Sequence, residues 1–122
     1  MPILDVEVVG EVADGGSLPR RIAEAASAAL FSPPERVWVK LYYLPQARYA
    51  EGDGGPPEGV APVFVRIAMA DPPDDNAIDG VVERLTRAIA ETTARPAENI
   101  HLLFEASTRD RISFGGRIVR RL

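Results

Sequence analysis

Two similar stretches decide the fold, because Pro2-Ile3-Leu4-Asp5-Val6-Glu7-Val8 recurs at an offset of 60 as Pro62-Val63-Phe64-Val65-Arg66-Ile67. Each copy is a proline followed by a run of residues that favour strands. A helical pattern follows in each half, over residues 18–30 and 78–93, and then a turn and a second strand, over residues 32–41 and 95–104. The sequence therefore predicts the order β-α-β twice.

Both predicted helices carry an apolar face at helical spacing. The residues that share these faces are Ile22, Ala25, Ala26, Ala29 and Leu30 in the first helix and Val81, Val82, Leu85, Ala88 and Ile89 in the second. Ser17 is expected to cap the first helix, and Asp74-Asp75-Asn76 gives the second an acidic start.

The two β-α-β units predict an α/β fold (α+β in some schemes) with a four-stranded sheet and both helices on one face. Each unit places its two strands parallel through a right-handed crossover. Residues 51–59 form a Gly/Pro-rich join that is typical of a loop. Since half of the chain buries too little core to fold alone, we expect one domain over residues 1–122, with pseudo-repeats 1–60 and 61–122.

The second face of the sheet is also expected to be apolar. Leu4, Val6, Trp38 and Phe64 are the residues assigned to it. An apolar sheet face has to be covered, and self-association is the simplest cover.

Composition excludes several classes of protein. The formal net charge is -4, with 14 basic and 18 acidic residues, so nucleic acid is not an expected partner. The absence of cysteine excludes disulfides and thiolate chemistry. No apolar run is long enough for a membrane span, and the first residues lack the features of a signal peptide. We expect a cytoplasmic protein with no membrane partner.

Pro2 is the first candidate for chemistry. Removal of Met1 would leave a secondary amine at the start of the chain, and an N-terminal amine has an ordinary pKa of about 7.7–8.0. Burial and nearby cations lower such a pKa, so the amine would be neutral near pH 7 and would serve as a general base. The alternative is that Met-Pro is simply how this chain begins.

Cations and one histidine are the candidates for holding an acidic substrate. The cations are Lys40, Arg66, Arg109, Arg111 and Arg117. Arginine binds carboxylates through two hydrogen bonds, although any single one of these side chains is more typical of a solvated surface. His101, the single histidine, is suited to polarise a carbonyl or to fill a structural position. It lacks the accompanying ligands of a metal site, so no metal is expected.

The start Met1-Pro2-Ile3, the doubled β-α-β plan and the ending Ile112-Ser113-Phe114-Gly115-Gly116-Arg117 resemble the tautomerase superfamily. The ending is similar to that of 4-oxalocrotonate tautomerase, whose subunit is about half as long. The chain therefore resembles two such subunits fused, as in macrophage migration inhibitory factor (MIF) and its relatives.

The resemblance implies a homotrimer, Pro2 as the catalytic base and no cofactor. It matches Pro62 to the same proline in the second half, where a peptide bond removes the base. It places His101 where the short tautomerases carry a substrate-binding arginine, and Phe114, or else Ile112, near their hydrophobic wall residue. The family's arginine after the first strand has no match at residues 11–14, where the sequence reads Glu-Val-Ala-Asp.

The sequence thus predicts a tautomerase that moves a proton in an unsaturated 2-hydroxy or 2-keto acid. Pro2 is its expected base, and the expected substrate-binding residues are His101, Arg66, Arg111, Lys40, Phe114 and Ile112. Two alternatives stay open: a trimeric binding or scaffold module without catalysis, and a hydratase of activated unsaturated acids that uses Pro2 as an acid.

Overall fold

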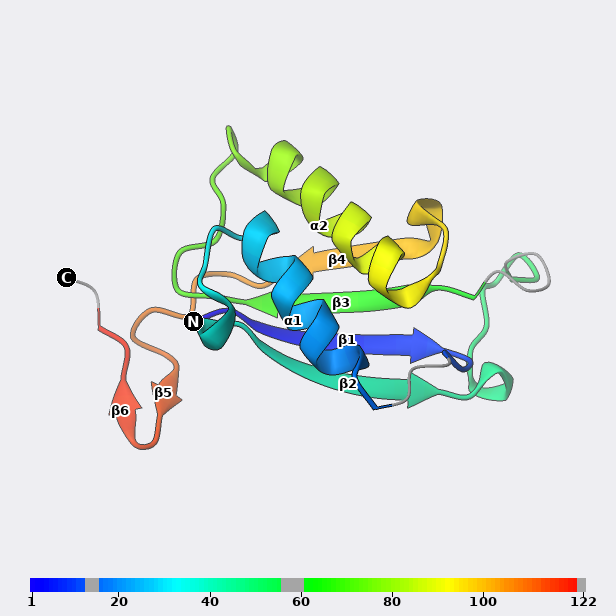
Figure 1. The fold of residues 1–122 in the computed structure, drawn as a ribbon, viewed down its shortest axis with the longest axis horizontal. Coiled ribbons are helices and arrows are strands. Elements are labelled where there is room, and N and C mark those ends of the chain that lie inside the picture. Colours follow the sequence, from blue (N-terminus) through cyan, green and yellow to red (C-terminus); the bar gives the residue numbers. More distant parts are fainter. Residues whose placement is uncertain (13–15, 56–60, 121–122) are drawn as a thin grey trace.

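The computed structural model describes residues 1–12, 16–55 and 61–120, and its elements follow the predicted order (Figure 1). They are β1 (Ile3–Val9), α1 (Leu18–Ala29), β2 (Trp38–Leu44), β3 (Val63–Ala68), α2 (Ile78–Thr93), β4 (Ile100–Phe104), β5 (Ser113–Phe114) and β6 (Arg117–Ile118). A short 3-10 turn precedes β2 and another precedes β4. Of the predicted join at residues 51–59, residues 56–59 lie outside the described ranges.

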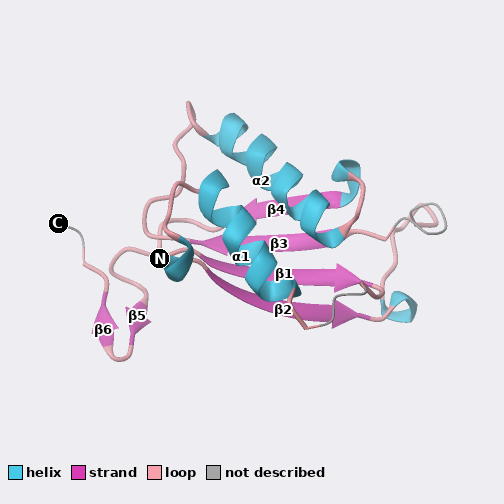
Figure 2. Ribbon diagram, in the orientation of Figure 1, coloured by secondary structure: helices cyan, strands magenta, loops and turns pink. Residues whose placement is uncertain are grey.

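The main sheet has the strand order β2-β1-β3-β4 (Figure 2). β1 runs parallel to β2, β3 runs parallel to β4, and the two central strands are antiparallel. Both helices lie on the same face of this sheet (Figure 1). The predicted fold class is therefore confirmed.

The core lies between the helices and the sheet. The largest fully buried side chains are Leu4, Val6, Val8, Val9, Leu18, Ile22, Val63, Val65, Ile67, Leu85, Ile89 and Thr93. They alternate along the strands and recur every three to four residues on the helices, so both periodicities meet in one cluster. In the described ranges, neither helix has the length and apolar content that crossing a bilayer requires.

The opposite face of the sheet is open, but its residues differ from those expected. Leu4 and Val6 are fully buried under the helices, so their assignment to the open face is wrong. Trp38 does lie on the open face and is 45% exposed. Side chains of a strand alternate between faces, so the open face carries the residues between the buried ones. It combines aromatic and charged side chains.

The structural alignment of β1 with β3 differs by one residue from the alignment that the two prolines suggest in the sequence. Phe31 and Ala94 close the two helices with φ values of 52° and 55°, which sets an offset of 63 and matches Trp38 to His101. Trp38 pairs with Ile3, whereas His101 pairs with Phe64. Ile3 therefore corresponds to Phe64, and Pro2 to Val63. The expected match of Pro2 to Pro62 is wrong by one residue, because a shift of one inverts the faces of a strand.

Candidate active site

Pro2 lies at the edge where β1 begins. It is buried, and its carbonyl accepts a hydrogen bond from the backbone N–H of Trp38 at 3.0 Å. Met1 precedes it and is 39% exposed. The parallel pairing of β1 with β2 thus fixes the first residues of the chain, and removal of Met1 would leave the Pro2 nitrogen at a defined position.

The C-terminal hairpin reaches the same end of the sheet. The rings of Trp38 and Phe114 meet edge to face, with centroids 5.1 Å apart. Ile112 is half-buried at the base of the hairpin, where its carbonyl accepts a hydrogen bond from the N–H of Val119 at 3.0 Å. Phe114 is therefore joined to the Pro2 end through Trp38, and Ile112 supports the hairpin that carries it.

An ion pair fastens this C-terminal segment to the loop after β3. The guanidinium of Arg109 donates to both carboxylate oxygens of Asp71, at 2.8 and 2.5 Å, and to the carbonyl of Arg120 at 3.0 Å. The hydrogen bond from Arg109 lowers the pKa of Asp71, opposed by partial desolvation and assisted by the positive amine of Met1. Asp71 therefore lies within electrostatic range of the start of the chain, and Arg109 is already paired.

Lys40 and Arg66 lie on the open face, each bound to a carboxylate. Nζ of Lys40 is 2.9 Å from Asp5, and this hydrogen bond raises the pKa of Lys40. Arg66 contacts Glu105 at 2.7 Å. A substrate carboxylate would have to displace these partners to bind either cation.

His101 lies in a separate groove on the open face, toward the other end of the sheet. The groove has a volume of about 690 Å³ and is lined mainly by Tyr42, Tyr49, Phe64, Arg66, His101 and Leu103, with Asp5 and Glu7 at its acidic side. The His101 ring lies 5.3 Å from that of Phe64, which pairs with Glu7. Glu7 is four residues beyond Ile3, or about 13 Å along the strand. Within one chain, His101 and Pro2 are therefore far apart.

Tyr49 forms the outer wall of this groove. Its hydroxyl donates to Glu51 at 2.5 Å, and this bond raises the pKa of Tyr49 to about 12. Its ring lies 5.8 Å from Phe64. Tyr49 was not predicted, because it follows β2 in an irregular segment where no periodicity marks it.

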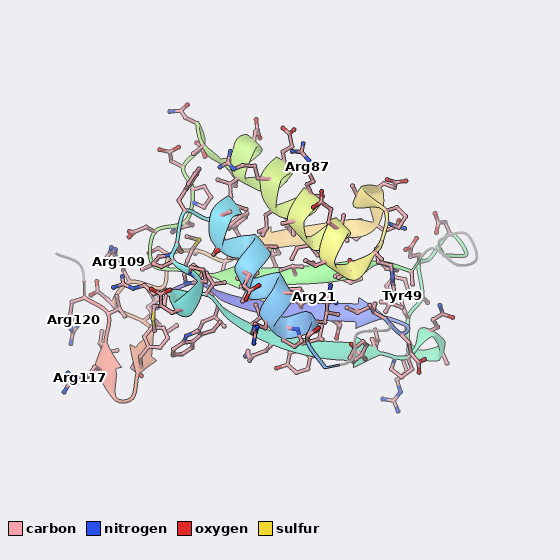
Figure 3. All side chains as sticks on the ribbon, viewed as in Figure 1. Arg21, Tyr49, Arg87, Arg109, Arg117 and Arg120 are labelled. Carbon is pink, nitrogen blue, oxygen red and sulfur yellow. The ribbon has the colours of Figure 1, made fainter. Side chains whose placement is uncertain are left out.

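Figure 3 shows Arg109, Arg117 and Arg120 at the end where the chain starts, and Tyr49 at the opposite end. Arg111 and Arg117 are exposed on the C-terminal segment, and within the described ranges no ion pair is found for either. The structure thus brings Phe114, Ile112 and these arginines to the Pro2 end, and it leaves Lys40, Arg66 and His101 on the open face. Residues 13 and 14 of the loop that lacks the family's arginine lie outside the described ranges.

No protein-family model and no curated protein sequence matches the chain. Solved structures do match. A fused 4-OT, a wild-type symmetric trimer, has a TM-score of 0.77 at 11% identity over 96% of this chain and 94% of its own. Pt0534 inactivated by 2-oxo-3-pentynoate has a TM-score of 0.75 at 14% identity, over 96% of this chain and 94% of its own. MIF of Toxoplasma gondii has a TM-score of 0.68 at 16% identity, over 95% of this chain and 98% of its own. The chain therefore has the tautomerase-superfamily fold that the 4-OT (4-oxalocrotonate tautomerase) and MIF structures share.

Proposed function

We propose that the chain is a cytoplasmic tautomerase that works without cofactor or metal, with the Met1-free Pro2 amine as its general base. The substrate is an unsaturated 2-hydroxy or 2-keto acid. The observation that carries the proposal is the placement of Pro2: it is buried at the start of β1 and bonded through its carbonyl to the N–H of Trp38, whose ring contacts the hairpin residue Phe114. Apolar surroundings disfavour an ammonium ion, which makes a terminal amine a better base near neutral pH.

The reaction moves one proton and leaves the electron count unchanged. The lone pair of the Pro2 nitrogen takes the enol O–H proton, and the oxygen's electrons form the carbonyl while the double bonds shift along the chain. The prolinium then returns the proton to the carbon at the far end of the conjugated system. A cation or hydrogen-bond donor that faces the developing oxyanion lowers the barrier.

We further propose that three copies assemble and that a neighbouring copy supplies His101 to each Pro2. The open face exposes Trp38, Tyr42 and Leu103, and large apolar side chains gathered on an exposed sheet face are typical of an interaction surface. The fused 4-OT with the same fold is a trimer. Lys40, Arg66, Arg111, Phe114 and Ile112 remain substrate-binding candidates of this shared site.

The first test is ketonisation of 2-hydroxymuconate and of phenylenolpyruvate, followed by ultraviolet absorbance. The protein has to be verified as Met1-free by intact mass. We expect Pro2→Ala to lower kcat/KM by about 10²–10⁴, which is the usual contribution of a general base. Pro62→Ala is the matched control, since the nitrogen of Pro62 is held in a peptide bond and its variant should stay active.

Covalent labelling is a second, independent test of Pro2 as the reactive residue. Pt0534 is inactivated by 2-oxo-3-pentynoate. We expect this compound to add once to the Met1-free chain and not to Pro2→Ala, as seen by intact mass. Equal activity of wild type and Pro2→Ala would remove Pro2 from the mechanism. No activity and no adduct in either protein would favour a trimeric binding module.

Mixing two inactive variants tests the shared site. If Pro2 of one copy works with His101 of the next, Pro2→Ala and His101→Ala trimers that are mixed and reassembled regain about a quarter of the sites. Sedimentation would measure the trimer. A monomer in solution, or no regained activity from a reassembled mixture, would contradict this arrangement.

The second candidate is a hydratase, in which a protonated Pro2 amine acts as a general acid. Titration of the ¹⁵N-labelled Pro2 nitrogen separates the two functions: a pKa below 7 supports the base, and a pKa near 9 supports the acid.

A further inference from the structure

A second hollow lies on the helix side of the molecule, apart from the groove on the open face. It has a volume of about 200 Å³ and sits between the end of α1, the loop after β3 and the first turns of α2. Its lining is Leu30, Phe31, Met69, Asp71, Pro73, Ala77, Val81 and Arg84. Six of these eight side chains are apolar, and the two charged ones stand on different elements.

Phe31 is the most unusual wall of this hollow. It is 79% exposed and adopts a left-handed conformation with φ of 52°. That conformation is strained for a residue other than glycine. Ala94 closes α2 at the corresponding position, so the helix end itself requires no aromatic ring. The backbone conformation of the helix end therefore does not account for the phenyl ring.

Arg84 completes the rim. Its guanidinium carbon lies 4.7 Å from the centroid of the Phe31 ring. Gly80 gives it room, because a Cβ there would come within 3.2 Å of Nη1 of Arg84. One turn further on, Arg87 is paired with Glu83 at 3.0 Å. Among the described residues, Arg84 has no carboxylate partner and presents its charge beside the hollow.

The hollow adjoins the Pro2 end of the sheet. Ala68 pairs with Ile3 in the antiparallel ladder, so Met69 continues the chain beside Pro2. Asp71, two residues later, is within electrostatic range of the amine of Met1. Two walls of the hollow are thus direct continuations of the strand that flanks the start of the chain.

We propose that this hollow is a binding subsite for a small monocarboxylate with one ring-sized apolar group. The apolar walls take the ring, and Arg84 takes the carboxylate. The volume suits one ring, since an apolar cavity of about 150 Å³ holds benzene. At the opposite rim Arg109 already pairs with Asp71, so Arg84 is the one cation of the lining that is placed to bind a carboxylate. Only the use of the bound acid as a substrate of Pro2 rests on the proposed function.

Binding of 3-phenylpropionate, which has no enol to react, tests the subsite directly. Titration calorimetry and amide chemical shifts of the Met1-free protein should show binding, with the shifts centred on Phe31 and Val81. Arg84→Gln should weaken binding about tenfold by removing a charged hydrogen-bond donor. Ala77→Phe should weaken it at least as much by filling the hollow. Both positions are exposed, so these variants are expected to fold.

Matched controls keep the result specific. Arg87→Gln changes an arginine one turn away on the same helix, and Ala97→Phe places the same ring at an exposed alanine before β4. Both should bind like wild type. Wild-type protein that does not bind 3-phenylpropionate, or that binds equally well after Arg84→Gln and Ala77→Phe, would overturn the proposal.

Kinetics separate this proposal from the proposed function. Ala77→Phe should raise KM for phenylenolpyruvate about tenfold, and leave KM for 2-hydroxymuconate unchanged, because only the first has a ring for the hollow. Loss of ketonisation in every protein, with specific binding intact, would reject the tautomerase and support the subsite. Ketonisation that depends on Pro2, with a KM that Ala77→Phe leaves unchanged, would support the tautomerase and reject the hollow as its substrate subsite.

Discussion

The two repeats close their helices in the same way but use the following residue differently. Phe31 and Ala94 both adopt a left-handed conformation at the helix end. After Ala94 comes Arg95, whose guanidinium donates to the carbonyls of Val9, Ala61 and Glu11 at 3.1, 2.7 and 3.1 Å. After Phe31 comes Ser32, and within the described ranges no side-chain hydrogen bond is found for it.

The end of α2 is therefore closed by hydrogen bonds from Arg95, which we call the Arg95 seal, whereas the end of α1 borders the hollow and is called the open end. At the second repeat the protein satisfies three of its own carbonyls with its own cation, and burial lowers the pKa of Arg95. At the first repeat, the hollow lies at the helix end and Arg84 stands at its rim over the ring of Phe31, with no ion pair found for it among the described residues. The two repeats thus differ in that one helix end is closed by its own cation and the other carries the proposed subsite.

The largest effect is expected from breaking the seal. Arg95→Met should lower the free energy of unfolding by about 2–3 kcal/mol, because three carbonyls lose a charged donor. Arg95→Lys should recover less than half, since an ammonium cannot reproduce the planar fork. Urea denaturation measures both. Arg87→Met, which removes only an exposed pair with Glu83, should change the value by less than about 0.5 kcal/mol. Equal losses at Arg95 and Arg87 would show that the seal contributes nothing.

A smaller effect of opposite sign is expected at the two helix ends. Ala94→Gly should raise the free energy of unfolding by about 1 kcal/mol, since glycine adopts the left-handed conformation without strain. Phe31→Gly should gain somewhat less, because it also removes the contact between its ring and Arg84, worth about 0.5 kcal/mol. Thermal melts compare the two variants. A loss of stability in Phe31→Gly would mean that the ring is needed for folding and not kept for a ligand.

The internal repeat and the helical spacing were enough to predict the two helices and a four-stranded sheet. The apolar residues of α1 and α2 recur at helical spacing, so α2 was predicted with the bounds it has and α1 to within one residue. The alignment of the first strands was wrong by one residue, because Pro2 and Pro62 look alike in a sequence. Only the pairing of Phe64 with His101 shows that their surroundings differ.

The sequence could not predict which arginines and lysines form ion pairs. Arg109 and Asp71 are 38 residues apart, and Arg66 and Glu105 are 39 apart, so no local pattern joins them. Arg84 looked like any other helical arginine. Only the structure shows that Arg84 lies over the ring of Phe31 from the other repeat and that no ion pair is found for it among the described residues. Candidate lists from a sequence name the charges, whereas the fold decides which of them are neutralised.

The smallest expected effect concerns the hairpin that the ion pair fastens beside Pro2. Arg109 lowers the pKa of Asp71, so this pair stabilises the docked hairpin above the ordinary pKa of an aspartate, about 3.9, and is lost as pH falls through the lowered value. Trp38, the single tryptophan, contacts Phe114 of the hairpin, and its fluorescence reports on docking. In wild type we expect the emission to shift to the red only below about pH 4.

Asp71→Asn separates this step from other acid effects. Its emission should already be shifted at pH 7, and it should then stay level while the wild-type emission changes, because the amide has no charge to lose. Asp5→Asn is the control: it breaks the pair with Lys40 on the open face and should keep the wild-type acid step. If Asp71→Asn followed the wild-type curve instead, the hairpin would be held by the Trp38–Phe114 contact and by backbone hydrogen bonds. The open end would then owe its shape to packing rather than to charge.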